Sequence, residues 1–127
     1  MKLKIVSLLL VTLVIASCAK VPITGRRQMK LLPAATLNSM ALSEYKTFLS
    51  THPLSTDQQK VATVKRVGER IQKAVTNYFR IKKQTKLLAG YKWEFNVVED
   101  RTVNAWCMPG GKVVVYTGLL PVTLNDD

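Results

Sequence analysis

Hydrolytic and metal-dependent chemistry needs residue types that are scarce in this chain. It has 127 residues and a single histidine, His52, which stands beside Pro53. A catalytic zinc site needs three protein ligands, usually histidines one helical turn apart and a carboxylate, together with a general base. Serine or cysteine catalysis needs a histidine within reach of the nucleophile. The sequence therefore predicts no catalytic residue and no metal ligand in this chain, which alone should be catalytically inactive.

The N-terminal residues indicate a different chemistry, the modification of a thiol. Lys2 and Lys4 precede an apolar run, Ile5–Ala16, which is too short to span a bilayer comfortably. A positive start, a short apolar core and small residues are the order of a secretory signal. Cys18 follows the small residues, as the acylated cysteine does in bacterial lipoproteins. We expect a lipoprotein signal peptide over residues 1–17 and lipidation of Cys18; the alternatives are a plain signal peptide and a short buried helix.

The second cysteine, Cys107, is left without a partner if Cys18 is acylated, so no internal disulfide is expected. It stands between Trp106 and Met108, where a lone thiol is most often a small core side chain. A role as nucleophile or metal ligand would need partners that the sequence does not offer. We therefore predict that Cys107 is part of the core.

Two helices should precede the β-rich half of the chain. Apolar residues at three- and four-residue spacing predict a helix over Thr36–Ser50, which ends before His52-Pro53. A second helix should begin near Ser55 or Thr56, because Thr56-Asp57-Gln58-Gln59 has the form of a capping box. Its apolar stripe continues to Phe79, and Gly68 on that stripe indicates a close contact of the helix.

Three strands should follow. Trp93, Phe95 and Val97 alternate with polar residues, which predicts a half-buried strand, and a second strand is predicted over Val103–Met108. Pro109-Gly110-Gly111 predicts a tight turn. The next stretch, 113–117, is apolar on both faces and should be the central strand. The predicted fold class is α+β, with two N-terminal helices and a three-stranded, largely antiparallel sheet.

This second half resembles family M48 of the zinc metalloendopeptidases, the gluzincins that include HtpX-like and Oma-one-like enzymes. The matching residues are Trp93-x-Phe95-x-Val97, Asn104-Ala105-Trp106, Pro109-Gly110-Gly111 and Thr117-Gly118-Leu119-Leu120. The resemblance implies the N-terminal half of a zincin-like peptidase domain, with zinc as its cofactor and an H-E-x-x-H helix after the hairpin. No such motif occurs up to Asp127, so we expect a chain cut off before its active-site helix and unable to bind zinc alone.

The strand that carries Asn104 and Ala105 has a use in enzymes of this kind. In zincins an exposed edge strand pairs with an extended substrate through main-chain hydrogen bonds. A small residue such as Ala105 would let a substrate backbone approach, and the Asn104 amide can both donate and accept. The resemblance implies that Asn104 and Ala105 bind substrate. From the residues alone, Asn104 would cap a turn and Ala105 would serve packing.

The chain is strongly basic, with 19 Lys and Arg against 8 Asp and Glu. Such a balance usually points to an anionic partner. The stretch from Lys60 to Lys92 holds a single acidic residue, Glu69, and is most densely basic over 80–86. It is expected to be either a solvated helix face or a contact with anionic lipid or an acidic client. Its aromatic residues lie on the apolar stripe, so no stacking platform for nucleic acid is evident.

The sequence thus predicts three parts: a lipoprotein signal over residues 1–17, a tether over 18–35 and a truncated metallopeptidase domain over 36–127. The implied whole protein is a membrane-anchored zinc metalloendopeptidase that hydrolyses peptide bonds of envelope proteins in quality control. Its partners would be polypeptide substrates and, through the lipid anchor, a membrane, with no nucleic acid.

Ala19 and Lys20, rather than an aspartate, follow the lipidated cysteine. In lipoproteins of Gram-negative bacteria this implies the outer membrane, with the domain facing the periplasm. One alternative is a short, non-enzymatic envelope lipoprotein that binds an extended peptide or a partner protein. Another is a basic, surface-adhesive lipoprotein acting through Lys82, Lys83 and Lys86.

Overall fold

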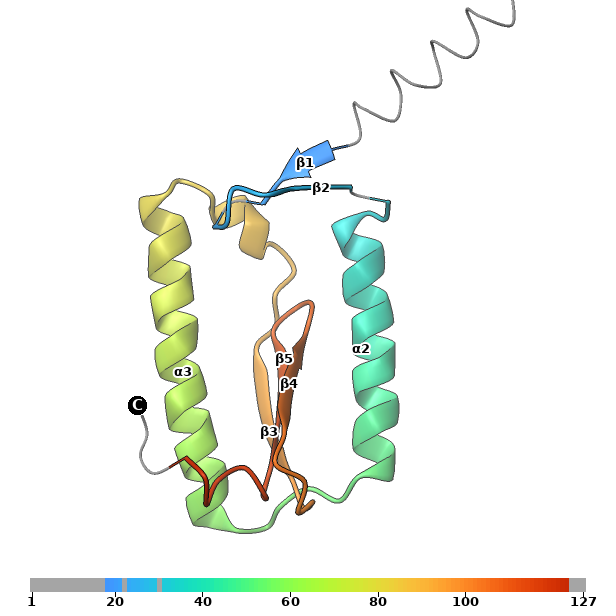
Figure 1. Ribbon diagram of the computed structural model, residues 1–127, viewed down its shortest axis with the longest axis vertical. Coiled ribbons are helices and arrows are strands. Elements are labelled where there is room, and N and C mark those ends of the chain that lie inside the picture. The colour runs from blue at the N-terminus through green and yellow to red at the C-terminus, as the bar shows by residue number, and fades with distance from the viewer. Residues whose placement is uncertain (1–17, 22, 30, 124–127) are drawn as a thin grey trace, which may run out of the picture. The chain divides into compact units, whose positions relative to one another are not determined.

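The computed structural model describes residues 18–21, 23–29 and 31–123 (Figure 1). The predicted signal peptide, residues 1–17, lies outside the described residues, and so does the side chain of Cys18. The chain divides into two compact units, Met1–Thr36 and Leu37–Asp127. None of the described helices combines the length and the apolar character needed to cross a membrane.

In the first unit, the segment predicted as a tether contains a small hairpin. Strand β1 (Cys18–Lys20) pairs antiparallel with β2 (Arg27–Met29). The N–H of Gly25 donates to the carbonyl oxygen of Val21 (2.9 Å), and Gly25 has a φ of 68°, in the left-handed region that glycine tolerates. The segment therefore has regular structure of its own, while its predicted boundary with the peptidase domain stays a prediction.

The first long helix, α2 (Ala34–Thr51), covers the predicted range and extends it by a few residues. Tyr45 lies on its buried face and is 1% exposed. The helix ends at Thr51, and the N–H of the next residue, His52, donates to the carbonyl oxygen of Phe48 (3.1 Å). The imidazole stacks on the Phe48 ring with 3.8 Å between centroids, and its Nδ1 lies 2.9 Å from the same carbonyl oxygen. The only histidine of the sequence is thus part of a helix terminus.

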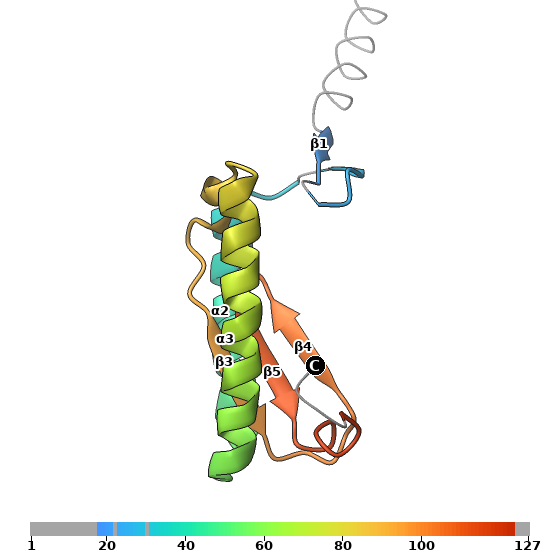
Figure 2. The same cartoon turned by 90° about the vertical axis from the view of Figure 1, so that its left-hand side faces the viewer.

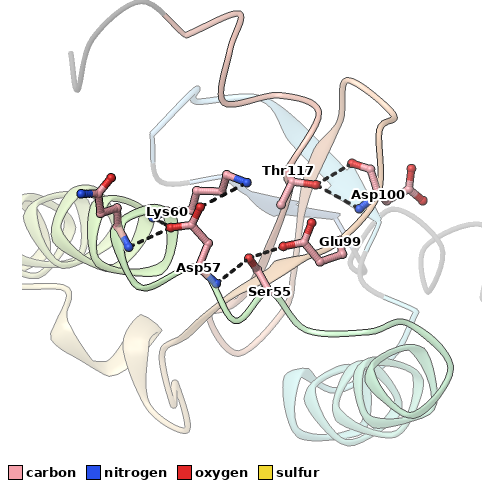
Figure 3. Close-up of polar contacts among 7 residues, drawn as sticks. Ser55, Asp57, Lys60, Glu99, Asp100 and Thr117 are labelled. Carbon is pink, nitrogen blue, oxygen red and sulfur yellow. Dashed lines mark hydrogen bonds and ion pairs between the residues drawn. The ribbon is translucent and has the colours of Figure 1, made fainter.

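The second long helix, α3 (Gln58–Ile81), begins one residue later than the predicted capping box implies. Asp57, and not Thr56, is the N-cap, because its carboxylate accepts from the N–H groups of Gln59 (3.0 Å) and Lys60 (3.2 Å) (Figure 3). These bonds, first of all the one from Lys60, lower the pKa of Asp57. A charged cap facing the positive end of the helix dipole explains why Asp57 takes this position.

The sheet contains β3 (Glu94–Val98), β4 (Ala105–Met108) and β5 (Lys112–Tyr116) in the order β3-β5-β4. The α+β class and the central position of the third strand are confirmed. The sheet is mixed, because β3 runs parallel and β4 antiparallel to β5, whereas a largely antiparallel sheet was predicted. The reason is that β5, apolar on both faces, inserts between β3 and β4 when the β4–β5 hairpin folds back.

The sheet lies between the two long helices (Figure 1). On the α2 side, a core cluster joins the helix to all three strands; its buried members are Tyr45, Val98, Val114 and Tyr116, and Phe48, Leu49, Trp106 and Met108 pack against them. Asn96 also faces this side and donates to the Tyr45 hydroxyl (2.5 Å). Asn96 is half-buried and Val98 is buried, whereas Glu94 at the start of the strand is exposed. The second half of β3 is therefore covered on both faces, and only its beginning is half-buried as predicted.

On its other face, β3 packs against α3. A Cβ added at Gly68 of the helix would overlap the Phe95 ring of the strand, so the glycine permits this close approach. The close contact predicted for Gly68 is therefore confirmed, with a strand as the neighbour. Figure 2 shows α3 in front of β3, while β5 and β4 extend beyond the helix. The outermost strand, β4, is thus the least covered of the three.

Candidate substrate-binding edge

β4 lies at one margin of the sheet, and no other strand pairs with its outer edge among the described residues. The opposite margin, the outer edge of β3, is partly closed by the connection between α2 and α3. There the N–H of Ser55 donates to the carbonyl oxygen of Val97 (2.8 Å), and the N–H of Glu99 donates to that of Pro53 (2.9 Å). Of the two margins, that of β4 is the one left available along its whole described length.

The hydrogen-bond pattern determines which main-chain groups of β4 point outward. The N–H of Tyr116 donates to the carbonyl oxygen of Asn104 (3.1 Å), and Ala105 lies opposite Val115. In an antiparallel pair, hydrogen-bonded and non-hydrogen-bonded residue pairs alternate. Asn104 belongs to a hydrogen-bonded pair, so Ala105 and Cys107 belong to non-hydrogen-bonded pairs. The N–H and C=O groups of Ala105 and Cys107 therefore point away from β5. Both residues therefore offer a donor and an acceptor at the open edge.

One face of β4 is held firmly by aromatic packing against α2. The Trp106 indole N–H donates to the Tyr116 hydroxyl (3.2 Å). The Trp106 ring also makes edge contacts with Phe48, at 4.8 Å between centroids, and with Tyr45, at 6.3 Å. A strand fixed by its inner edge and one face can bind a guest strand without first becoming ordered, which lowers the entropy cost of binding.

The opposite face of β4 carries Ala105 and Cys107, and both are exposed. The prediction that Cys107 is a core residue is therefore wrong. Side chains alternate along a strand, and the larger Trp106 and Met108 occupy the α2 side, so Cys107 points to the other face. The small side chains of Ala105 and Cys107 leave room for another chain beside the strand.

Asn104 precedes β4 and is exposed. Its carbonyl oxygen is used in the contact with β5, as described above, but its side-chain amide makes no hydrogen bond within the described part of the chain. Among the described residues, no backbone group of a turn is hydrogen-bonded to the Asn104 amide, so the alternative role as a turn cap has no support there. The roles of Asn104 and Ala105 in substrate binding stay predictions. Both residues lie at the edge of the sheet, where a substrate strand would pair.

The turn that leads from β3 into β4 is fastened to the end of β5. The N–H of Asp100 donates to Thr117 Oγ1 (3.1 Å), and that hydroxyl donates to the carbonyl oxygen of Asp100 (3.0 Å) (Figure 3). The N–H of Gly118 donates to the same carbonyl (2.8 Å). Hydrogen bonding from the Thr102 backbone lowers the pKa of Asp100. Thr117 and Gly118 matched the family in sequence, and their role is to place this turn.

A metal site needs several ligating side chains close together. No group of three or more His, Cys, Asp or Glu side chains that could hold a metal ion is found among them. The imidazole of His52 is engaged with Phe48 at the end of α2. The side chains in the part of the chain that the structure describes therefore do not fit a zinc ion.

Known proteins are similar to parts of this chain. The model of peptidase family M48 matches residues 58–127. Mitochondrial metalloendopeptidase OMA1 of Saccharomyces cerevisiae is 51% identical over 43 residues, which are 32% of this chain and 12% of the yeast protein. The OMA1 proteins of Schizosaccharomyces pombe and Arabidopsis thaliana are 45% identical over 40 residues and 46% identical over 50 residues.

The shared segments are 32% and 39% of this chain in the fission yeast and plant comparisons. They cover only 12% and 10% of those two relatives, so this chain matches about a tenth of the length of each relative. The family match is longer than these segments, and it includes α3, the whole sheet and every residue of the β4 edge. Since it extends over more than half of the residues, the chain belongs to peptidase family M48.

Proposed function

We propose that this chain supplies the substrate-pairing strand of a zinc-dependent metalloendopeptidase. The observation that carries the proposal is the open edge of β4, with the main-chain groups of Ala105 and Cys107 pointing outward. Peptidases of family M48 depend on zinc in general. The zinc ligands and the general base would come from outside the described residues, in the H-E-x-x-H motif that the resemblance implies.

The edge would select an extended polypeptide rather than a particular sequence. A guest strand pairs through its main chain, which every residue possesses, so recognition depends on the substrate being unfolded. The amide of Asn104 can add one donor and one acceptor at the start of the strand. The bound metal would polarise the scissile carbonyl and activate a water molecule. The residues of this chain would hold the substrate still beside that centre.

Replacing Ala105 with proline in the protein expressed from its whole gene should lower kcat/KM for unfolded casein about tenfold, because one substrate hydrogen bond is lost. Proline removes an N–H that points outward, and the first residue of an edge strand tolerates it. Cleavage would be followed by release of labelled peptides, with and without a chelator. The isolated 127-residue chain should release none.

The matched control is Ala105→Ser, which keeps both the small side chain and the main-chain N–H and should cleave like the parent. Thermal unfolding of both variants would show that the fold is kept. If Ala105→Pro folds normally and cleaves at the parental rate, substrate does not pair with this edge. Turnover that survives the chelator would contradict the assignment of a metallopeptidase.

We further propose that the chain is anchored by acylation of Cys18 and acts at the bacterial cell envelope, at the outer membrane and facing the periplasm. The support is the order of the N-terminal residues: positive charges, a short apolar run, small residues and then the cysteine. In this setting the substrates would be misfolded or misassembled envelope proteins. Acyl chains contribute about 0.8 kcal/mol per buried CH₂, so several of them hold a protein durably at a membrane.

The expected result of growth with a radiolabelled fatty acid is a labelled protein, and Cys18→Ala should abolish the label. Cys107→Ser, which removes the other thiol of the sequence, is the control and should leave the label in place. Labelling that persists in Cys18→Ala would show that this thiol is not the acceptor.

The same open edge would also suit a non-enzymatic envelope lipoprotein that binds an extended peptide without cleaving it. Reading the gene beyond the codon for Asp127 distinguishes the two functions. An in-frame H-E-x-x-H motif within a helix's length supports the peptidase, and a stop codon supports the short binder.

A further inference from the structure

The end of α3 and the turn after it form a basic surface, here called the α3–η1 tip, residues 78–88 (yellow to gold in Figure 1). The short 3₁₀-helix η1 (Thr85–Leu88) follows α3 after three residues. The tip carries four exposed cations, Arg80, Lys82, Lys83 and Lys86. No acidic residue occurs between Glu69 and Glu94 in the sequence. The charge of the tip is therefore of one sign.

The backbone of the tip is ordered by its own hydrogen bonds. The N–H groups of Lys82 and Gln84 donate to the carbonyl oxygens of Tyr78 (3.0 Å) and Phe79 (2.8 Å). Lys83 lies between them with a φ of 54°, which turns the chain sharply out of the helix. The N–H of Leu87 then donates to the carbonyl oxygen of Gln84 (3.0 Å). The cations are thus presented from a defined turn.

None of the four cations forms an ion pair with an acidic side chain within the described residues. The Arg80 guanidinium donates to Asn77 Oδ1 (2.8 Å), and Lys82 Nζ lies 5.9 Å from the centroid of the Tyr78 ring. The negative end of a helix dipole is equivalent to about half an elementary charge. It can offset a small part of the four positive charges, so the tip keeps a strong positive field.

Large apolar side chains stand among these cations. Ile81 is 65% exposed, Leu87 is 44% exposed and Tyr78 is 37% exposed. A face that serves only solubility would gain nothing from them. Bilayer interfaces bind this combination of side chains: cations that reach phosphates, aliphatic side chains that enter the acyl boundary and a tyrosine at headgroup level. Nucleic acid fits less well, because the only aromatic ring exposed at the tip is already next to Lys82.

We propose that the α3–η1 tip docks on an anionic phospholipid surface, with Ile81 and Leu87 entering the interface and Lys82, Lys83 and Lys86 contacting headgroup phosphates. This interaction goes beyond the proposed peptidase function and does not require acylation of Cys18. In an anchored protein it would give the second unit a preferred orientation at the membrane.

The test places an environment-sensitive fluorophore on the tip itself. The full chain carries Cys18→Ser, Cys107→Ser and Ile81→Cys, so that the labelled thiol is the only one. It is mixed with vesicles of phosphatidylcholine and phosphatidylglycerol in equal parts, with pure phosphatidylcholine vesicles, or with an oligouridylate. Emission wavelength and quenching by aqueous iodide report whether the probe leaves water, even if the N-terminal segment also holds the chain to the vesicle.

The expected result is a blue shift with protection from iodide on the anionic vesicles alone, weakened by salt because Lys–phosphate contacts are screened. Lys82→Gln, Lys83→Gln and Lys86→Gln together should lower this affinity about a hundredfold, since each cation near an anionic surface contributes about fivefold.

The charge-matched control, Lys46→Gln, Lys65→Gln and Arg101→Gln, removes three exposed cations elsewhere and should bind like the parent. A probe that stays in water, equal loss in the control, or protection by the oligouridylate instead would overturn the proposal.

Discussion

Replacing Gly118 with alanine is expected to lower the free energy of unfolding by about 3 kcal/mol, at the upper end of the range for overpacking. An added Cβ would overlap the carbonyl group of Arg101. The obstacle is backbone, which cannot turn aside as a side chain can. Both segments are also fixed by hydrogen bonds, because Gly118 and Thr117 hold Asp100. Any relaxation must break these contacts or move the turn.

The effect should extend to the edge of the sheet, because the Arg101–Thr102 turn leads into Asn104 and β4. Chemical denaturation measures the loss of stability. The casein cleavage assay, carried out on the protein expressed from its whole gene, measures the loss of substrate pairing with β4. Val122→Ala is the control, since Val122 is 59% exposed and its truncation should change stability by less than about 0.5 kcal/mol. A Gly118→Ala protein as stable as the parent would show that the turn is free to move.

Local patterns predicted the elements better than their pairing. The apolar run of β5 indicated a central strand, and it is central. The parallel pairing of β3 with β5 is a contact between distant segments, which alternation within one strand does not encode. Alternation could have placed Cys107 correctly, because Trp106 and Met108 are the larger neighbours and take the core side. The single-residue shift of the helix cap arose because Thr56 and Asp57 are both good N-caps.

In the candidate site, too, the sequence predicted the element and not its hydrogen-bond register. The family resemblance indicated that Asn104 and Ala105 lie on an exposed edge, and β4 is indeed an edge strand in the described part of the chain. Which main-chain groups face outward depends on the register between β4 and β5, and sequence alternation does not give this register. The outward N–H and C=O groups of Cys107 could therefore not be predicted from the sequence. Lys112 was missed altogether, because a lysine next to a glycine turn is usually exposed.

Lys112 is in fact 4% exposed, and its ammonium group is enclosed by three partners. It donates to the carbonyl oxygen of Lys92 (2.5 Å) and to the Glu94 carboxylate, and it lies 5.7 Å from the centroid of the Tyr45 ring. Burial raises the pKa of Tyr45, and the nearby Glu94 carboxylate raises it further. The phenol therefore remains neutral at physiological pH and presents an uncharged π face to the cation.

Glu94→Gln is expected to lower the free energy of unfolding by about 3 kcal/mol, because it leaves the buried Lys112 charge without its counter-charge. Lys112→Met should cost clearly less, since the Glu94 side chain is 47% exposed and can be hydrated once its partner is gone. The double variant should be more stable than Glu94→Gln alone, because the uncompensated buried charge has been removed. Chemical denaturation of the four proteins gives the coupling energy directly.

The unequal costs expected for Glu94→Gln and Lys112→Met indicate the role of the ion pair in the fold. Glu94 and Met108 lie opposite Lys112 on either side, so the pair acts where β5 meets both neighbours. A slip of β5 by one residue against both neighbours would separate Lys112 from Glu94. It would also move Ala105 and Cys107 from the outward-pointing to the inward-pointing positions of β4 and turn Trp106 away from α2. A buried charge with one acceptable position opposes such a slip. If Lys112→Met proves the more damaging of the two single variants, the lysine stabilises by packing and the register must be set by the Pro109–Gly111 turn alone.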